Sequence, residues 1–141
     1  MKTMEKISRK LRFMKRYVDF LKSHRAISAE ELEENYELRS AIERNLELAL
    51  ESMLDIGEII ISEKGFEKPE DYKSVMLILG REGVLPKVFA EKLVPAVGVR
   101  NILVHMYTEV DVKKICEFLR GNLGDFDGFA KHVANYLKKS R

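Results

Sequence analysis

The sequence predicts an all-α protein folded as an antiparallel bundle of about five to six helices, and three observations support this prediction. Apolar residues recur at alternating spacings of three and four along most of the chain, which is the periodicity of amphipathic helices. Glycines and prolines stand between these segments, where helices end or begin. No stretch shows the alternating pattern of a strand, and the sequence contains no internal repeat.

Length and composition indicate one folded domain, residues 1–141. Hydrophobic residues make up 45% and charged residues 34%, a balance typical of globular proteins. No apolar run approaches the roughly 20 residues that a membrane span needs, and the first residues lack the apolar core of a signal peptide. The single cysteine, Cys116, cannot form an internal disulfide and is expected to be a small core residue. We therefore expect a cytoplasmic protein without a membrane partner.

The net charge of +2 conceals an uneven distribution along the chain. Residues 1–25 carry nine Lys and Arg against two acids, whereas residues 26–71 carry four against fourteen. The remaining residues, 72–141, carry twelve against seven. One interpretation is that these charges are the solvated faces of helices. The other is a basic surface that binds RNA and an acidic surface that binds a basic partner.

The first helix is expected from Met4 to about Lys22, and a long second helix is expected from Ala29 to Glu63. Ser28 and Glu31 form a capping box before the second helix, because each side chain can accept from the other residue's backbone N–H. The residues expected on the buried faces are Ile7, Leu11, Met14, Val18 and Leu21 in the first helix, and Ile42, Leu46, Ala49, Leu50, Met53, Leu54, Ile56 and Ile60 in the second.

Glycines and prolines divide the middle of the chain. Gly57 is expected to mark a close crossing of two helices, since glycine is costly in a helix interior. Gly65 should end the second helix in the left-handed conformation. Pro69 should open a third helix, and Gly80 and Gly83 should end it.

The second half of the chain is expected to form three more helices. Pro86 should start the fourth helix, and Pro95 with Gly98 should kink or break it shortly before residue 100. The later elements are a fifth helix over Asp111–Leu119, a turn over 121–124 and a last amphipathic helix from Phe126.

The stretch Arg100-Asn101-Ile102-Leu103-Val104-His105-Met106-Tyr107 contains a cation, an amide, an imidazole and a phenol. The guanidinium of Arg100 presents a planar fork of donors that fits phosphate oxygens. His105 can accept or donate a proton near neutral pH. Together these groups suit the attack of a ribose 2′-hydroxyl on its neighbouring phosphate, and the attack requires no metal ion. The clustering of carboxylate, His and Cys typical of a metal site is absent from the sequence.

The spacing of these residues raises a geometric question. Residues five apart on an ideal helix lie roughly 140° apart around its axis, so Arg100 and His105 do not share a face. Arg100 and Tyr107, seven apart, do. Either the helix ends or distorts here, or a second copy of the chain completes the site. The spacing alone is equally consistent with a His105 that has no catalytic role and is buried in the core or paired with another residue at the surface.

The stretch from Arg100 to Tyr107 resembles the R-x4-H-x-Y motif of HepT-type toxins, which belong to the HEPN superfamily of helical ribonucleases. The resemblance continues through Ser62–Tyr72, which matches the family's segment between its second and third helices. The pair Val110-Asp111 and the segment 125–129 also stand where the family has them. The similarity therefore covers nearly the entire chain, which makes it more specific than the motif alone.

This resemblance implies a metal-independent endoribonuclease that needs no cofactor and works as a homodimer, with the two motifs facing a shared cleft. It implies that Arg100 and His105 are catalytic and that Asn101 supports them. It also implies that an MntA-type nucleotidyltransferase antitoxin blocks the toxin by transferring AMP to Tyr107. The chain departs from the family at Val99, where an aromatic residue is expected, and this change affects packing more than chemistry.

Several alternatives stay open at this point. Tyr107 could instead cap the bundle with its hydroxyl at the surface. Asp55 and Glu58, one turn apart, could orient Arg100 or His105, or could be solvated acids on a helix face. The function that we expect is cleavage of RNA by the toxin of a two-gene pair. The alternative is a non-catalytic helical module that docks a nucleotidyltransferase.

Overall fold

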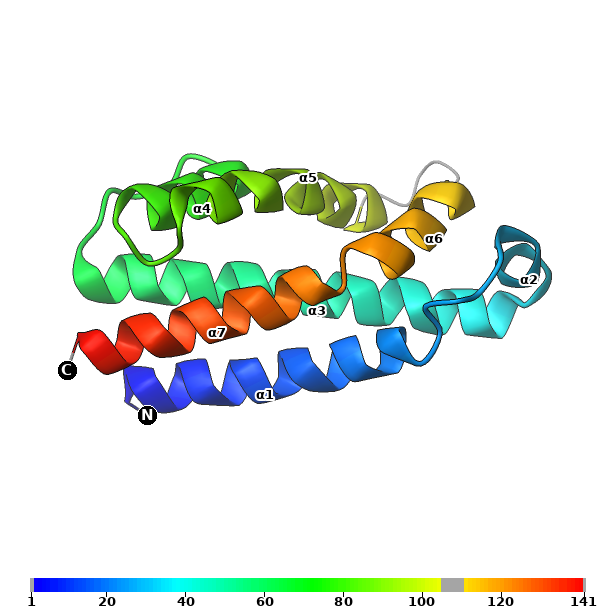
Figure 1. The fold of residues 1–141 in the computed structure, drawn as a ribbon, viewed down its shortest axis with the longest axis horizontal. Helices are drawn as coiled ribbons and strands as arrows, with labels where there is room; N and C mark the ends of the chain where they lie inside the picture. The colour runs from blue at the N-terminus through cyan, green and yellow to red at the C-terminus, as the bar shows by residue number, and fades with distance from the viewer. Residues whose placement is uncertain (1, 105–110, 141) are drawn as a thin grey trace.

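The computed structural model describes residues 2–104 and 111–140 of the chain, and these ranges contain helices and no strand. The all-α prediction is therefore confirmed. The helices in the described ranges are α1 (Thr3–Lys22), α2 (Ala29–Glu34), α3 (Tyr36–Lys64), α4 (Tyr72–Arg81), α5 (Lys87–Val104), α6 (Val112–Gly121) and α7 (Gly124–Lys139) (Figure 1).

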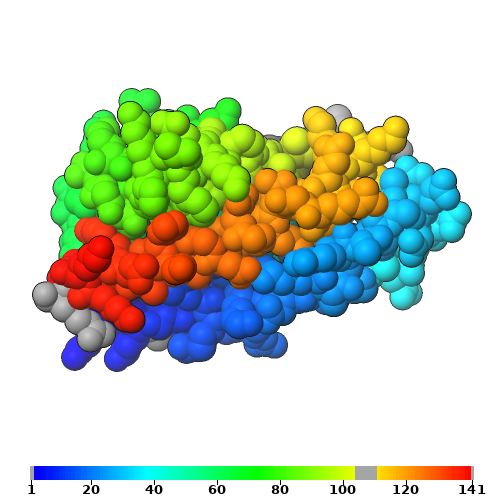
Figure 2. Space-filling view, viewed as in Figure 1, coloured from blue at the N-terminus to red at the C-terminus, as the bar shows by residue number. Residues whose placement is uncertain are grey.

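The long helix α3 is the centre of the bundle. It contacts α1, α2, α4, α5 and α7, and Figure 1 shows α1 on one side of it and the α4–α5 pair on the other. On the face seen in Figure 2, α1, α6, α7 and the α4–α5 pair form a continuous surface that covers most of α3. The predicted stripe of α3 is buried at all eight positions, which are Ile42, Leu46, Ala49, Leu50, Met53, Leu54, Ile56 and Ile60.

The prediction of one helix over Ala29–Glu63 was wrong, because the chain breaks at Asn35. The backbone of Asn35 is extended (φ −112°, ψ 91°), and its Oδ1 accepts a hydrogen bond from the backbone N–H of Leu38 at 3.0 Å. Asn35 thus ends α2 and caps α3, as its short amide side chain favours. The predicted capping box of α2 is confirmed, since the backbone N–H of Glu31 donates to Ser28 Oγ at 3.1 Å.

Two glycines behave as predicted in and after α3. Gly65 adopts the left-handed conformation (φ 68°) and ends the helix. Gly57 faces α4, and a Cβ atom at this position would lie 2.7 Å from Cγ1 of Val75 and 3.1 Å from Cδ1 of Leu79. The absence of a side chain at Gly57 therefore allows α4 to approach α3 closely.

The start and end of α4 differ from the prediction. The helix begins at Tyr72 rather than at Pro69, because Asp71 is its cap and accepts from the backbone N–H of Ser74 at 2.8 Å. At the other end the helix continues past Gly80 to Arg81. The turn that follows contains Gly83 with a positive φ of 78°.

Helix α5 runs without a break through Pro95, so the break expected there does not occur. Proline removes one hydrogen bond of the helix, but Leu93, Ala96 and Val97 on either side of it are buried in the core. The packing of these residues outweighs the local penalty. As a consequence, Arg100 and Asn101 are held by a continuous helix.

The last two helices fit the sequence with small changes. Asp111 caps α6 by accepting from the backbone N–H of Lys113 at 2.9 Å, and Cys116 is buried on the inner face as expected. The turn is shorter than predicted, because α6 continues to Gly121 and α7 begins at Gly124. In the part of the chain that the structure describes, no helix has the length and apolarity needed to cross a membrane.

Candidate active site around Arg100

Two of the four predicted site residues lie near the end of α5, and the other two lie outside the described residues. Arg100 and Asn101 are neighbours on the C-terminal part of this helix. His105 and Tyr107 fall in the range 105–110, which the structure does not describe. Their roles therefore stay predictions, and the structure gives the surroundings of Arg100 and Asn101.

The guanidinium of Arg100 is held on three sides. Its Cζ lies 4.5 Å from the centroid of the Tyr72 ring, which is a cation–π contact. Its Nη2 lies 3.6 Å from Oε1 of Glu51 on α3. Its Nη1 donates to Oδ1 of Asn101 at 3.4 Å. With 16% of the side chain exposed, the guanidinium has one orientation fixed by three different elements of the fold.

One nitrogen atom of this guanidinium contacts none of these partners. The Nε atom of Arg100 is buried and has no hydrogen-bond partner among the described residues. A buried donor without a partner costs about 1–3 kcal/mol, so such an atom calls for an explanation. Arginine binds phosphate oxygens through pairs of N–H groups. Because Nε is buried, a phosphate oxygen reaches it only when the side chains that cover it move.

Acidic side chains line the face of α3 next to Arg100. Glu51, Asp55 and Glu58 are spaced by four and three residues and therefore share one face. Burial, and then the negative charge of Asp55, raise the pKa of Glu58, whereas the charge of Arg100 acts in the opposite direction. Asp55 accepts from Nζ of Lys10 on α1 at 3.2 Å. Of the two acids singled out from the sequence, Glu58 thus interacts electrostatically with Arg100, whereas Asp55 forms an ion pair with Lys10.

Sequence reasoning missed the two residues that contact Arg100 from other helices. Glu51 lies one turn before Asp55 on the same face, and this spacing was a signal that could have identified it. Tyr72 carried no such signal, because it lies 28 positions before Arg100 and its contact depends on how α4 and α5 pack.

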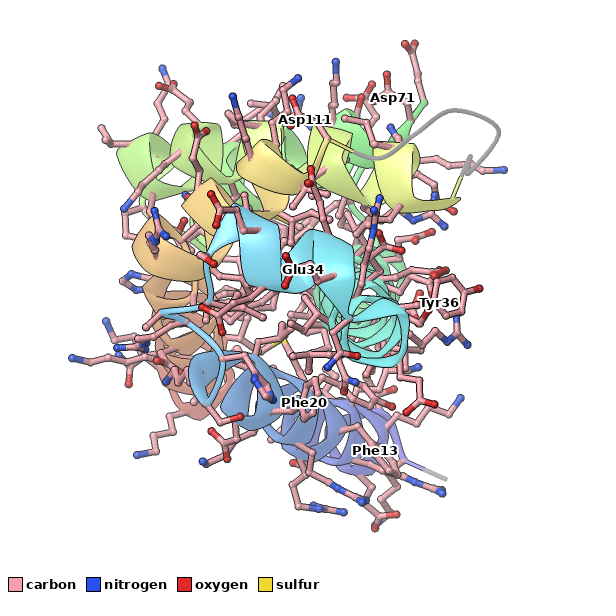
Figure 3. The ribbon with its side chains drawn as sticks, turned by 90° about the vertical axis from the view of Figure 1, so that its right-hand side faces the viewer. Phe13, Phe20, Glu34, Tyr36, Asp71 and Asp111 are labelled. Atoms are coloured by element: carbon pink, nitrogen blue, oxygen red, sulfur yellow. The ribbon has the colours of Figure 1, made fainter. Side chains whose placement is uncertain are left out.

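A cleft of about 480 Å³ opens beside this group, where α3, the segment before α4, α4 and α5 meet. Figure 3 shows the position of Asp71, one of its lining residues, at the upper edge of the molecule. The lining residues are Glu58, Pro69, Glu70, Asp71, Tyr72, Lys73, Val75 and Asn101.

The described residues offer no second cluster of catalytic groups. His24 and His132 each pack against a phenylalanine, Phe20 and Phe89, with ring centroids 4.9 Å apart. Burial raises the pKa of Cys116, which keeps its sulfur in the unreactive thiol form. Within 2–104 and 111–140, no group of three or more His, Cys, Asp or Glu residues is placed to hold a metal ion.

Comparison with known proteins gives matches over most of the chain. The tRNA nuclease HepT of Aphanizomenon flos-aquae is 27% identical over 131 residues, which cover 93% of this chain and 89% of that protein. The mRNA nuclease HepT of Shewanella oneidensis is 23% identical over 99 residues, which cover 70% and 74%.

Solved structures show the same fold. The tri-AMPylated HEPN toxin of Shewanella oneidensis, solved in complex with an MNT antitoxin, has a TM-score of 0.81 at 21% identity, covering 92% of this chain and 96% of that one. The cytosolic protein of unknown function YutE from Bacillus subtilis has a TM-score of 0.85 at 22% identity, with 97% and 92% covered. The family model described as ribonuclease HepT-like matches residues 14–133. The resemblance found in the sequence is thus confirmed, and the chain belongs to the ribonuclease HepT-like family of HEPN proteins.

Proposed function

We propose that this protein is a metal-independent endoribonuclease and the toxin of a toxin–antitoxin pair. Membership of the ribonuclease HepT-like family supports the activity, and two relatives carry the names tRNA nuclease and mRNA nuclease. The observation that carries most weight is the guanidinium of Arg100, which Tyr72, Glu51 and Asn101 hold in place and whose Nε has no partner among the described residues. A guanidinium fixed in place with a free donor is suited to a phosphate.

The proposed reaction is a transfer within the RNA backbone. The ribose 2′-oxygen attacks the adjacent phosphorus while the bond from phosphorus to the 5′-oxygen breaks. This step leaves a 2′,3′-cyclic phosphate and a 5′-hydroxyl. His105 transfers the proton of the 2′-hydroxyl to the departing 5′-oxygen, and Arg100 stabilises the negative charge on the phosphate oxygens in the transition state. Asn101 supports this role by accepting a hydrogen bond from Nη1 of Arg100.

We further propose that two copies of the chain build one working site. Helix α5 is described as far as Val104, and on an ideal helix a residue five positions after Arg100 would point about 140° away from it. A two-fold pair of chains can bring Arg100 of one copy to His105 of the other. Ile102, which lies two positions after Arg100 and so on another face of α5, is 42% exposed, as expected for a residue that a partner covers.

The proposed partner in regulation is an MntA-type nucleotidyltransferase that adds AMP to Tyr107. Two similar solved structures support this proposal, because one is of a tri-AMPylated HEPN toxin with an MNT antitoxin and the other is of a toxin–antitoxin with AMP-PNP. An added AMP brings a negative charge near the position of the substrate phosphate, where it repels the RNA.

Cleavage of RNA by purified variants tests the proposed activity. Arg100→Ala and His105→Ala should each lower the cleavage rate by about 10²–10⁴-fold, and EDTA should leave the wild-type rate unchanged. Arg44→Ala is the matched control, because Arg44 is 62% exposed and pairs with Glu47 on the surface of α3. Loss of activity in EDTA contradicts the metal-free mechanism. A wild-type protein that cleaves no RNA but binds the antitoxin supports the alternative, a non-catalytic docking module.

Mass spectrometry of the chain after co-expression with the antitoxin tests the regulation. The mass should rise by one or more AMP units, all on Tyr107, and Tyr107→Phe should escape the modification and stay toxic. A neutralised complex with an unmodified Tyr107 shows instead that the antitoxin acts by covering the site.

A further inference from the structure

An aromatic residue, Tyr72, lines the cleft beside Arg100. The ring of Tyr72 borders the cleft, and the residue is 39% exposed although it also carries the guanidinium of Arg100. The fold does not need this ring for its core, because α4 is capped by Asp71 and buries Val75, Met76, Ile78 and Leu79 instead. An exposed aromatic ring next to a phosphate-binding group is the arrangement on which nucleobases stack in proteins that bind single-stranded nucleic acids.

The walls of the cleft offer one acceptor and one donor that are not otherwise used. The carboxylate of Glu58 makes no hydrogen bond or ion pair with another described residue. Partial burial, and then the charge of Asp55, raise its pKa. The side chain of Asn101 accepts from Arg100 through Oδ1, which leaves its NH2 group as a donor. A carboxylate and an amide on one rim can bind a base edge that carries an N–H group beside an acceptor.

The charges of the cleft exclude a phosphate as the main occupant. Glu58, Glu70 and Asp71 are acidic, and Lys73 is the only cation among the described residues that line the cleft. A second phosphate group would meet net negative charge here, whereas an uncharged base would not. The volume of about 480 Å³ lies within the usual range for small-molecule sites, which reach from about 300 to 1,000 Å³.

We propose that this cleft binds a nucleobase of the RNA next to the scissile phosphate, stacked on Tyr72 and contacted at its edge by Glu58 and Asn101. The inference rests on the proposed function, because Arg100 must hold the phosphate for the neighbouring base to reach the cleft. It makes Tyr72 a substrate-binding residue and gives the enzyme a base preference at one position of its substrate. The two named relatives act on different RNA classes, so a base-selecting site bears directly on what sets members of the family apart.

The first test combines a protein change with a substrate change. A short RNA that spans a mapped cleavage site is prepared with each nucleotide that flanks the cleaved bond made abasic in turn. At one position, loss of the base should lower kcat/KM of the wild-type protein by roughly 5- to 150-fold, the range of one base–aromatic stack. Tyr72→Leu should cause a similar loss on the intact RNA and little further loss on the abasic RNA. Tyr72→Phe keeps the ring, so it should still cleave the intact RNA faster than the abasic RNA, as the wild-type protein does.

The same comparison separates stacking from a purely positioning role. If Tyr72 only holds Arg100, Tyr72→Leu lowers cleavage of the intact and the abasic RNA by the same factor, and the proposal is wrong. It is equally wrong if no single base matters to the wild-type protein. Tyr36→Leu is the matched control, since Tyr36 is 81% exposed at the start of α3, away from Asp71 and the cleft (Figure 3). Thermal denaturation checks that each variant is folded.

A second test does not require cleavage, so it separates failure of this inference from failure of the proposed function. NMR titrations compare AMP, GMP, CMP and UMP with ribose 5-phosphate, which has no base. The wild-type protein should bind at least one nucleotide more tightly than ribose 5-phosphate, and Tyr72→Leu should remove that difference. Equal affinity for ribose 5-phosphate and all four nucleotides overturns the inference even if the protein cleaves RNA. If a base-dependent difference appears in a protein that cleaves no RNA, the cleft binds bases and the proposed activity is wrong.

Discussion

Among the described residues, guanidinium groups lie over the aromatic rings of Phe13 and Tyr72, and the surroundings of the two rings differ. On α1, Arg9 and Arg16 lie over the ring of Phe13 at 5.6 and 5.9 Å, on the outer face of a strongly basic helix. At the other site, Arg100 lies 4.5 Å from the centroid of Tyr72. Figure 3 shows Phe13 at the lower edge of the molecule and Asp71, which precedes Tyr72, at the upper edge.

The difference lies in how many elements hold each guanidinium. Arg9, Phe13 and Arg16 belong to one helix, and helical spacing alone brings them together. Arg100 is held by a ring from α4 and a carboxylate from α3, and its side chain is 16% exposed. Contacts within one exposed helix provide positive charge but do not fix the orientation of the guanidinium. Contacts from three helices do fix the orientation of the Arg100 guanidinium. A phosphate in a transition state requires the second arrangement.

The sharpest way to test this contrast is to replace arginine by lysine at both sites. Lysine keeps the charge but loses the planar fork and the stacking surface. Arg100→Lys should lower the cleavage rate by about 10²–10³-fold, as when one preorganised donor is removed. The double variant Arg9→Lys, Arg16→Lys should cleave RNA at the wild-type rate. Equal losses at the two sites in a cleavage assay contradict the distinction.

The position of Tyr72 can also be disturbed without changing any charged group. Gly57→Ala places a methyl group 2.7 Å from Cγ1 of Val75, in a crossing that positions α4 and with it Tyr72. Overpacking of this kind should lower the free energy of unfolding by about 1–3 kcal/mol. Gly98→Ala is the control, because apart from its chain neighbours and the backbone of its own helix no described atom lies within 4 Å of its added carbon. This change should stabilise α5 by about 0.5–1 kcal/mol. Urea denaturation measures both values, and an unchanged stability of Gly57→Ala means that α4 can move away at little cost.

Removing the carboxylate that holds Arg100 should make this site more like the one on α1. Glu51→Gln leaves the shape of the side chain but removes the ion pair at 3.6 Å. For a pair of this distance and exposure we expect a cleavage rate about 5-fold lower, which corresponds to ~1 kcal/mol. In a double-mutant cycle, Glu51→Gln should add little to Arg100→Lys. Asp55→Asn is the control, since Asp55 pairs with Lys10 on α1 and its loss should leave cleavage unchanged.

The smallest expected effect concerns pH. Burial and Asp55 raise the pKa of Glu58, so the folded state disfavours the charged carboxylate. The group therefore favours folding below the ordinary carboxyl pKa near 4.5, and this contribution is lost as the pH rises through the raised pKa. Glu58→Gln should accordingly be slightly more stable than the wild type at pH 7 and equally stable at pH 4. Melting temperatures that differ by the same amount at both pH values contradict this assignment.

Features that depend on neighbours within one helical turn or one apolar stripe could be predicted from the sequence alone. The capping box of Ser28, the left-handed Gly65 and the buried stripe of α3 all follow from local hydrogen bonds and from the helical period. The motif with Arg100 and Asn101 is equally local, and its resemblance to the HepT-type toxins was sufficient to identify the family. His105 and Tyr107 belong to that motif and stay predictions.

The surroundings of Arg100, in contrast, depend on how the helices pack in three dimensions. The break at Asn35 and the unbroken helix through Pro95 show that local preferences can give way in either direction, since one amide capped a helix and buried neighbours kept another intact. The contacts of Glu51 and Tyr72 with Arg100 join residues far apart in the sequence. Their meeting depends on how closely α4 crosses α3 at Gly57 and on where α5 packs, and these distances are set by the whole core rather than by any local segment.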